Sequence, residues 1–399
     1  MTEKLYLNDG EMLDFTARVI SADQVDGGWE IILDRTAFYP QSGGQLFDTG
    51  LLDNKTVINV LKRDDEVVHV VADWETDIGT LVEGKIDRER RLDNRRKHTG
   101  QHILSQSFIR TAGAKTVSAH LGEIESTIEL SVAEIDENQL EAAEDLANRI
   151  VMENHPIEIG YYDREELGNM PIRKIPELGG GEYRIIGIGD FDYTACGGTH
   201  CRRTGEIGSI KIIGQEKIRG HVRIIFLTGR QAVTDYREKH KVLTSLVGRL
   251  TCHFTDLDGS VGKILEQNVS LRRDLTDLNR QMMSFRAESL IKNAVPIAGG
   301  YLVVDRFDGI DIKNLRELAQ VLVQKGQVAV VLLADDKVLM AASEDSGFDA
   351  SHMARIFMEN FGGRGGGNRA FAQVGGIPLD KRSEISDNLI NILKQELGG

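Results

Sequence analysis

The sequence lacks several features that define large classes of protein. It has only 3 cysteines in 399 residues, which argues against a disulfide framework and indicates a reducing compartment. No apolar run approaches the roughly 20 residues that a membrane-spanning helix needs, and the polar start of the chain shows no secretory signal. Positive charge is not in excess either, because the net charge is −14, and this discourages indiscriminate binding to nucleic acid. We therefore expect a soluble cytoplasmic protein without membrane contact, in which any RNA binding uses a local basic face.

The first half of the chain predicts two domains of a multidomain α+β protein. Residues 1–86 contain short β-branched runs separated by glycine and aspartate turns, as in a small β-barrel-like domain. Residues 87–228 open with a helix that Asp87 can cap at its N-terminus, and continue with alternating strand patterns and a second amphipathic helix. Gly100 would cost this first helix about 1 kcal/mol relative to alanine, which indicates that another segment approaches closely there.

The second half predicts a helical arm and a compact αβ domain. Residues 229–295 form a long polar helix pattern in which apolar residues from Leu257 to Phe285 alternate spacings of four and three, with Asn268 in the seam. This pattern is typical of a coiled-coil arm and of pairing into a homodimer; a long helix packed on its own domain is the alternative. Residues 296–399 alternate strands and helices, carry a glycine-rich loop at 362–376, and end in a helix from about Lys381 to Leu397.

Two pairs of metal-ligand residues are the most informative motifs. His98 and His102 lie four positions apart on the predicted helix, so both imidazoles share one face. Cys196 and His200 flank Gly-Gly-Thr, where the glycines allow a tight fold. Three imidazoles and a thiolate form a donor set that zinc prefers at tetrahedral geometry. Four bound residues would make a closed structural site, whereas a displaced His200 would leave a position for an activated water; two unrelated pairs remain the alternative.

The loop at 36–45 carries polar groups that a small substrate could use. Thr36 and Gln45 can hydrogen-bond a polar acyl group, although such a loop alone is more often a strand connection. Basic residues gather in two other places, just before the first histidine pair and in the glycine-rich loop, where they could contact a phosphate backbone. A solvated helix face and a flexible turn are the respective alternatives. The candidate RNA-binding residues are Arg95, Arg96, Lys97, Arg364 and Arg369.

Taken together and in order, these motifs resemble one family. Four motifs are similar to the editing and C-terminal parts of alanyl-tRNA synthetase. They are Thr36-x-Phe-Tyr-x-x-Ser-Gly-Gly-Gln45, His98-x3-His102, Cys196-Gly-Gly-Thr-His200 and the glycine-rich segment 362–376. The match covers nearly the whole chain, so we expect no aminoacylation domain. The chain therefore resembles the long form of AlaX, the free-standing alanyl-tRNA editing proteins.

The resemblance implies a fold and an activity. It implies a β-barrel-like domain, a zinc-containing α+β editing domain, a helical arm and a C-terminal DHH-associated domain. Such proteins hydrolyse the ester of tRNA(Ala) mischarged with serine, and in some cases with glycine. The members of the family bind one zinc ion at the positions of the two doublets, and their amino-acid pocket is bordered by the 36–45 loop, although many relatives carry an acidic residue where Gln41 stands. The residues implied are His98, His102, Cys196 and His200 for zinc, and Thr36, Ser42 and Gln45 for the substrate.

A site that hydrogen-bonds the seryl hydroxyl would reject alanine, and we expect Thr36 or Gln45 to make that bond.

Besides an editing enzyme, two further hypotheses on function stay open at this point. A non-catalytic tRNA-binding module with structural zinc would carry the same motifs. A detached editing and C-terminal piece of a split synthetase is the third reading, against which the start of the chain at residues 1–13 weighs.

Overall fold

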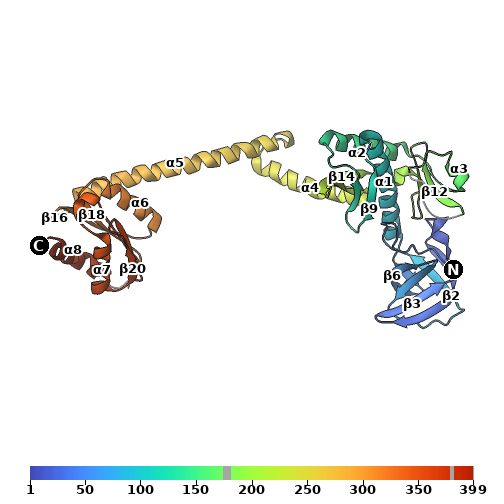
Figure 1. Cartoon of the computed structure of the whole chain (residues 1–399), viewed down its shortest axis with the longest axis horizontal. Helices are drawn as coiled ribbons and strands as arrows, with labels where there is room; N and C mark the ends of the chain where they lie inside the picture. The colour runs from blue at the N-terminus through green and yellow to red at the C-terminus, as the bar shows by residue number, and fades with distance from the viewer. Residues whose placement is uncertain (174–180, 378–381, 399) are drawn as a thin grey trace. The chain divides into compact units, whose positions relative to one another are not determined.

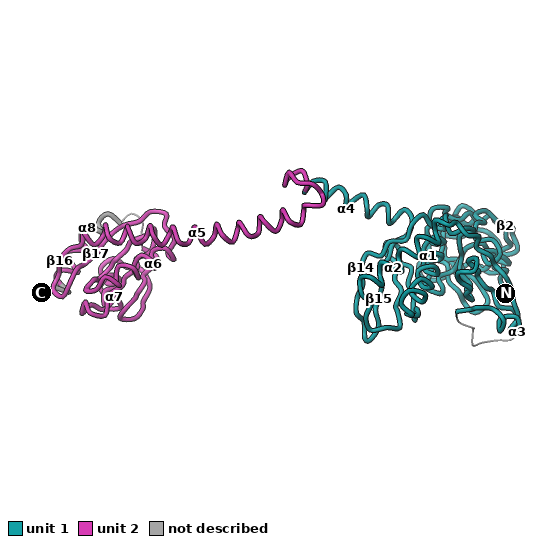
Figure 2. The backbone as a smooth tube through the Cα atoms, turned by 90° about the horizontal axis from the view of Figure 1, so that it is seen from above, with its two compact units in different colours: residues 1–246 teal, residues 247–399 magenta. Residues whose placement is uncertain are grey.

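The computed structural model describes residues 1–173, 181–377 and 382–398, which excludes Lys381, the expected start of the last helix (Figure 1). The chain divides into two compact units, residues 1–246 and 247–399 (Figure 2). None of the described helices is both long and apolar enough to cross a membrane.

A closed β-barrel occupies the N-terminal part of the first unit, in the strand order β2-β3-β7-β6-β5-β8. Alternation places Val19, Ile31 and Val60 in its core, as the period of two in these runs predicts. Two residues of β1 (Glu3–Lys4) pair in parallel with β4 (Arg35–Thr36), where the 36–45 loop begins. The barrel strands are β2 (Asp14–Val25), β3 (Gly28–Leu33), β5 (Gly50–Leu52), β6 (Lys55–Arg63), β7 (Glu66–Val71) and β8 (Leu81–Ile86).

Helix α1 (Arg88–Ala112) is the central element of the remaining part of the first unit. The Asp87 carboxylate accepts hydrogen bonds from the backbone N–H groups of residues 89 and 90, so the predicted N-cap is confirmed. A Cβ at Gly100 would lie 2.8 Å from Cγ2 of Thr228, at the end of β15, which explains the glycine inside this helix. Most of the buried side chains in the first half of α1 are polar, so the helix carries little of the apolar periodicity of an ordinary surface helix.

Two antiparallel sheets and a second helix surround α1. One sheet has the order β14-β15-β10-β9 and the other β11-β12-β13. Helix α2 (Glu137–Glu153) begins with a capping box between Asp136 and Gln139. Ile103 and Phe108 of α1 pack with residues of the first sheet and of α2 in one hydrophobic core. The remaining elements are β9 (Thr116–Leu121), β10 (Ser126–Leu130), β11 (Ile157–Tyr162), α3 (Arg164–Leu167), β12 (Tyr183–Ile188), β13 (Asp192–Ala195), β14 (Ile210–Ile218) and β15 (His221–Thr228).

The segment expected to form the helical arm contains two helices rather than one. Helix α4 (Gly229–Leu250) ends just before Thr251, whose φ of +50° cannot continue an α-helix, and α5 (Leu257–Lys292) follows a short 3-10 turn. The apolar seam of α5 is exposed in the chain: Leu271, Leu275 and Leu278 are 60–66% exposed. The helix is thus present, and the coiled coil remains a proposal.

The C-terminal domain is a mixed sheet with helices on both faces. The strand order is β16-β17-β18-β19-β21-β20, with β17 and β18 parallel. Residues alternate between two cores along β18: Val331 packs on the face of α7 and α8, and Leu332 packs on the face of α5 and α6. The elements are β16 (Val295–Ile297), β17 (Gly300–Phe307), α6 (Ile312–Val323), β18 (Val328–Ala334), β19 (Lys337–Ala342), α7 (Ala350–Phe361) and α8 (Arg382–Gly398).

The glycine-rich segment is not the loop that the sequence predicts. It forms an edge hairpin of β20 (Arg364–Gly367) and β21 (Phe371–Gly375). A Cβ at Gly365 would lie 2.0 Å from the carbonyl oxygen of Gln373, and one at Gly367 would lie 2.1 Å from that of Phe371. The two strands approach so closely that the hairpin requires glycine at these positions, and glycine gives no strand signal in the sequence.

Candidate metal centre

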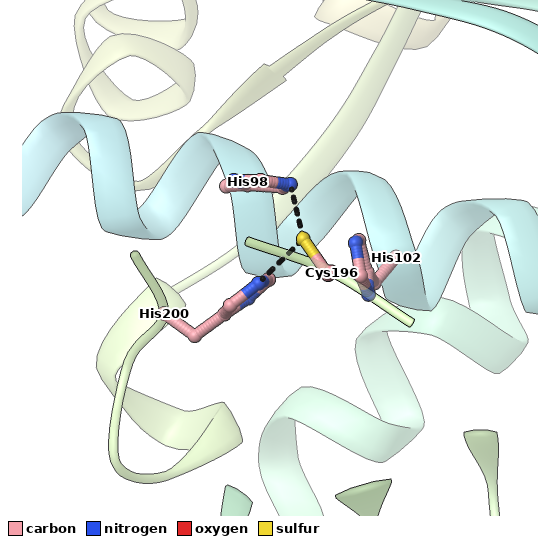
Figure 3. Close-up of side chains that lie close together, drawn as sticks. All are labelled: His98, His102, Cys196 and His200. Carbon is pink, nitrogen blue, oxygen red and sulfur yellow. Dashed lines mark hydrogen bonds between the residues drawn. The ribbon is translucent and has the colours of Figure 1, made fainter. Parts of the chain in front are cut away.

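The four predicted metal-ligand residues lie together in the first unit (Figure 3). His98 and His102 come from α1, and Cys196 and His200 come from the loop after β13. Their ligand atoms all lie within 4.8 Å of one another. The Sγ atom of Cys196 is 3.3 Å from Nε2 of His98 and 3.3 Å from Nε2 of His200. Two doublets almost a hundred residues apart therefore form one cluster.

Gly198 allows the loop to lie against the ring of His98. A Cβ at this position would lie 2.0 Å from Cε1 and 2.2 Å from Nδ1 of His98, which no side chain tolerates. The backbone N–H of Gly198 points to Sγ of Cys196 at 3.4 Å. The second glycine of the motif thus brings the thiol and the imidazole to the same point.

Electrostatics favour a neutral-imidazole and thiolate donor set. Burial lowers the pKa of His98 to about 3 and that of His200 to about 4, and it holds the pKa of His102 well below its usual range. Burial also opposes ionisation of Cys196, but His200, the Gly198 N–H and Arg184 outweigh it and lower the pKa of the thiol. Metal ligands must offer lone pairs rather than protons, so this set suits a divalent cation.

One orphaned atom tests the fit to a metal. Nδ1 of His102 is buried and makes no hydrogen bond within the described residues, and it lies 3.9 Å from Oδ2 of Asp192. Asp192 is itself buried and is held by Arg173, with 2.6 Å between Nε and Oδ1. A metal-bound histidine commonly turns its other nitrogen to a carboxylate. The donor set and the neighbouring carboxylate therefore fit a zinc ion.

Gln45 connects the 36–45 loop to this centre. Its Oε1 accepts hydrogen bonds from Nδ1 of His98 at 2.7 Å and from the backbone N–H of Thr199 at 3.1 Å, and its Nε2 donates to Oγ1 of Thr199 at 2.9 Å. The amide oxygen of Gln45 is therefore fully engaged inside the protein. Ser42 differs, because it is only half-buried, and its hydroxyl contacts the phenol of Tyr39 rather than the metal centre.

Thr36 is enclosed in the barrel and contacts a histidine that sequence reasoning missed. Its Oγ1 lies 2.8 Å from Nε2 of His69 and accepts the N–H of Phe38 at 3.1 Å. Nδ1 of His69 donates to the carbonyl of Ile31 at 3.1 Å, so Nε2 accepts the Thr36 hydroxyl proton. Burial lowers the pKa of His69 to about 4. The sequence does indicate that His69 is buried, because the alternation in β7 places it on the same face as Val67 and Val71.

A buried ion pair fixes the loop against α1. Arg91 is 1% exposed and its side chain bonds the carboxylate of Asp48, which is 0% exposed. The same guanidinium donates to the carbonyls of Gly10 and Ala37, and Asp48 also accepts the N–H of Tyr39. The sequence shows Arg91 only as part of a basic run and gives no sign of this partner.

In the basic run of α1, Arg95 and Lys97 are buried and Arg96 is half-buried, so these candidates for RNA contacts have partners inside the protein. Arg95 is buried and donates to the carbonyl of His200, with Glu206 as an ion-pair partner. The ammonium of Lys97 donates to the carbonyls of residues 122 and 123 at 2.9 Å, and Arg96 donates to the carbonyl of Glu206. Of the three, Arg95 joins α1 directly to the loop that carries His200. The other two candidates, Arg364 and Arg369, are exposed.

Comparison with known proteins matches three segments of the chain to family models. Residues 8–90 match a model of class II (A) tRNA synthetases, residues 183–225 match the second additional domain of threonyl- and alanyl-tRNA synthetases, and residues 299–395 match the DHHA1 domain. An alanyl-tRNA editing protein, AlaX-L of Pyrococcus horikoshii, is 28% identical over 408 residues, which cover all of both chains. The chain is a homologue of alanyl-tRNA editing protein AlaX-L.

Alanine–tRNA ligases match the same residues. The ligase of Archaeoglobus fulgidus is 32% identical over 414 residues, covering 100% of this chain and 44% of the ligase, so the chain spans less than half of that relative. A crystal structure of the C-Ala domain of Aquifex aeolicus alanyl-tRNA synthetase aligns at 26% identity over 27% of this chain and 98% of that domain, with a TM-score of 0.24. Cys196 and His200 lie within the match to the second additional domain, and Arg364 and Arg369 lie within the DHHA1 match.

Proposed function

We propose that this AlaX-L homologue is a trans-editing deacylase that hydrolyses the ester of Ser-tRNA(Ala), with Gly-tRNA(Ala) as a second substrate. The observation that carries the proposal is the convergence of three imidazoles and a thiol at one point, joined by Gln45 to the 36–45 loop. The similarity to a whole alanyl-tRNA editing protein supports the same reaction class.

The chemistry of the amino acids explains why such an activity is useful. A pocket shaped for alanine cannot firmly exclude glycine, which is smaller, and serine adds only a hydroxyl. Discrimination of this kind is limited to about 100-fold, so a second hydrolytic site improves fidelity. A site with a polar group for the seryl hydroxyl rejects alanyl-tRNA, because that group would lose its partner.

We assign zinc to His98, His102 and Cys196, with His200 as the fourth donor. Zinc, when bound, would supply Lewis-acid polarisation of the ester or activation of a water. The carboxylate of Asp192 lies 3.9 Å from Nδ1 of His102, the nitrogen that would face away from the ion. The protein's own contribution is to hold four donors at one point, to keep the imidazoles neutral and to lower the pKa of the thiol.

The contact with the seryl hydroxyl moves from the residues first expected to Ser42. Thr36 is completely buried and gives its proton to His69, and the amide oxygen of Gln45 already accepts two hydrogen bonds. Ser42 is only half-buried, so a ligand can reach its hydroxyl beside Tyr39, and it lies in the same turn as Gln45, to which its backbone is paired. Ser42→Ala is expected to reduce kcat/KM for Ser-tRNA(Ala) more than for Gly-tRNA(Ala).

We place RNA contacts on the second unit. Arg364 lies on the edge strand β20 and Arg369 lies in the turn that follows, and both side chains are exposed. Arginine side chains of this kind are suited to phosphate oxygens. Replacing both by alanine should weaken tRNA binding and flatten its dependence on salt, while hydrolysis of saturating substrate persists.

Deacylation assays with purified protein test the proposal directly. Ser-tRNA(Ala), Gly-tRNA(Ala) and Ala-tRNA(Ala) are compared side by side, and we expect hydrolysis of the first two. Cys196→Ala should abolish the activity, whereas Cys252→Ala, a cysteine between α4 and α5, serves as the matched control. Full activity of a metal-free Cys196→Ala variant would exclude a zinc-dependent mechanism.

One observation favours a second candidate, a tRNA-binding module with a structural metal. If all four donors bind at once, the tetrahedral shell is closed and no position is left for water. This protein would bind zinc and tRNA(Ala) but leave Ser-tRNA(Ala) intact. The deacylation assay separates the two candidates. His200→Ala adds a second test: removing the fourth donor should disrupt the fold if the metal is structural, but should leave zinc binding intact if the metal is catalytic.

A further inference from the structure

Gln45 reaches the metal centre from a segment that carries no metal ligand. It is completely buried, and it follows the turn of the 36–45 loop. The backbone N–H of Thr199 points at Oε1 of Gln45, at 3.1 Å. A backbone N–H can only donate, so the oxygen of the amide must face it, and the reverse orientation would set an NH2 group against an N–H. The Thr199 backbone therefore fixes which way the amide points.

The orientation of this amide determines where the proton of His98 resides. Nδ1 of His98 lies 2.7 Å from the same Oε1 atom. Because a carbonyl oxygen only accepts, Nδ1 must carry the hydrogen, and a neutral imidazole carries only one. Nε2 is then the nitrogen with the lone pair, and it is the atom that lies 3.3 Å from Sγ of Cys196.

We propose that Gln45 is a positioning residue that holds His98 as the Nδ1–H tautomer, with the lone pair of Nε2 directed into the cluster. The inference rests on the metal centre of the proposed function and deepens it. In the opposite tautomer, Nε2 would present a hydrogen to the centre and could not bind a cation. Metal-binding histidines in proteins commonly donate the N–H of one ring nitrogen to an outer partner, so that the other nitrogen is free to bind the metal.

Gly198 shows that the arrangement is tightly built. A Cβ there would lie 3.0 Å from Oε1 of Gln45 as well as within 2.2 Å of the His98 ring. The amide, the imidazole and the peptide of the glycine loop are therefore in contact on one side of the ring. The loop motif that ends in Gln45 and the motif that begins with Cys196 both contact His98. This shared contact explains why both motifs are needed to build the centre.

Three variants separate this role from general packing. Gln45→Met keeps the length of the side chain but removes the amide acceptor, and Gln45→Glu keeps an acceptor oxygen for both His98 and Thr199. Gln101→Met is the matched control, because Gln101 is a buried glutamine of α1, the helix that carries His98, and its amide donates to Ser105. Zinc affinity is measured by competition with a chromophoric chelator, and Co²⁺ spectra report the thiolate and imidazole ligands. We expect a loss of about 10- to 100-fold for Gln45→Met, and affinity equal to wild type for the other two.

The tautomer itself can be read without metal. Imidazole ¹⁵N chemical shifts of His98 in the metal-free wild-type protein should show Nδ1 protonated and Nε2 bare. An Nε2–H tautomer, or wild-type zinc affinity in Gln45→Met, overturns the inference. If Gln45→Met does not fold, as circular dichroism would show, the ¹⁵N measurement and Gln45→Glu still decide it. If the wild-type protein binds no zinc, the proposed metal centre is wrong. If Gln45→Met changes neither zinc binding nor deacylation, only the proposed role of Gln45 is wrong.

Discussion

Acidification should destabilise the barrel through His69. This imidazole is buried between Thr36 and the carbonyl of Ile31, and burial lowers its pKa from 6.5 to about 4. Between those two pH values the unfolded chain binds a proton that the folded protein does not, so the free energy of unfolding falls as the pH falls. Each pH unit corresponds to about 1.4 kcal/mol, so the whole interval represents about 3 kcal/mol. This stability is present above pH 6.5 and is lost as the pH approaches 4.

The assay is urea unfolding followed by tryptophan fluorescence at pH 7 and pH 4.5. The chain has 2 tryptophans, and both Trp29 and Trp74 belong to the barrel, so the signal reports this domain. His69→Gln can donate to Ile31 and accept from Thr36 but does not titrate. We expect the wild-type protein to lose about 2–3 kcal/mol more than the variant over this range, because all other titrating groups cancel in the comparison. Parallel loss in both proteins would refute the reasoning.

Three other perturbations have matched controls or direct readouts. Gly198→Ala should abolish zinc binding, because its Cβ would overlap the His98 ring, while Gly197→Ala should be tolerated, because a Cβ there meets nothing within 4 Å; isothermal titration with Zn²⁺ checks both. Arg91→Met should destabilise the first unit by about 3–5 kcal/mol, because it leaves Asp48 buried and unpaired. Replacing the exposed Arg88 by alanine should not destabilise it. Denaturant midpoints measure the difference, and equal midpoints for the two variants would contradict the prediction. Leu275→Asp should convert a dimer to a monomer in sedimentation, because Leu275 is 60% exposed in the apolar seam of α5, and an unchanged mass would exclude pairing through that seam.

The sequence predicted those features that leave a local or periodic signal. The N-cap at Asp87, the alternation of the barrel strands and the period of α5 all depend on neighbours in the chain. The four candidate metal ligands were identifiable because each doublet has a helix or loop spacing suited to one ion. In each case the physical cause operates over a few residues, so the pattern is visible without the fold.

The features that the sequence did not predict depend on distant partners. Gln45 and Thr199 are 154 residues apart, and a hydrogen bond between them leaves no pattern in the chain. Arg95 and Lys97 were interpreted as an RNA-facing run because charge alone does not show that acceptors from other segments enclose it. The hairpin at Gly365 was interpreted as a loop, since close backbone approach requires glycine, the residue that ordinarily indicates a turn.

The polar face of α1 links the barrel to the metal centre. Arg91, Arg95, His98 and His102 are spaced by four, three and four, the positions at which an ordinary helix places its apolar core. Their partners come from different segments: Asp48 for Arg91, the His200 carbonyl for Arg95, and Gln45 for His98. A buried polar group without its partner costs about 1–3 kcal/mol, so the helix is stable in this position only when those segments are all in place. Loss of the Arg91 ion pair should therefore weaken zinc binding as well as the barrel, although Arg91 lies two helical turns from His98.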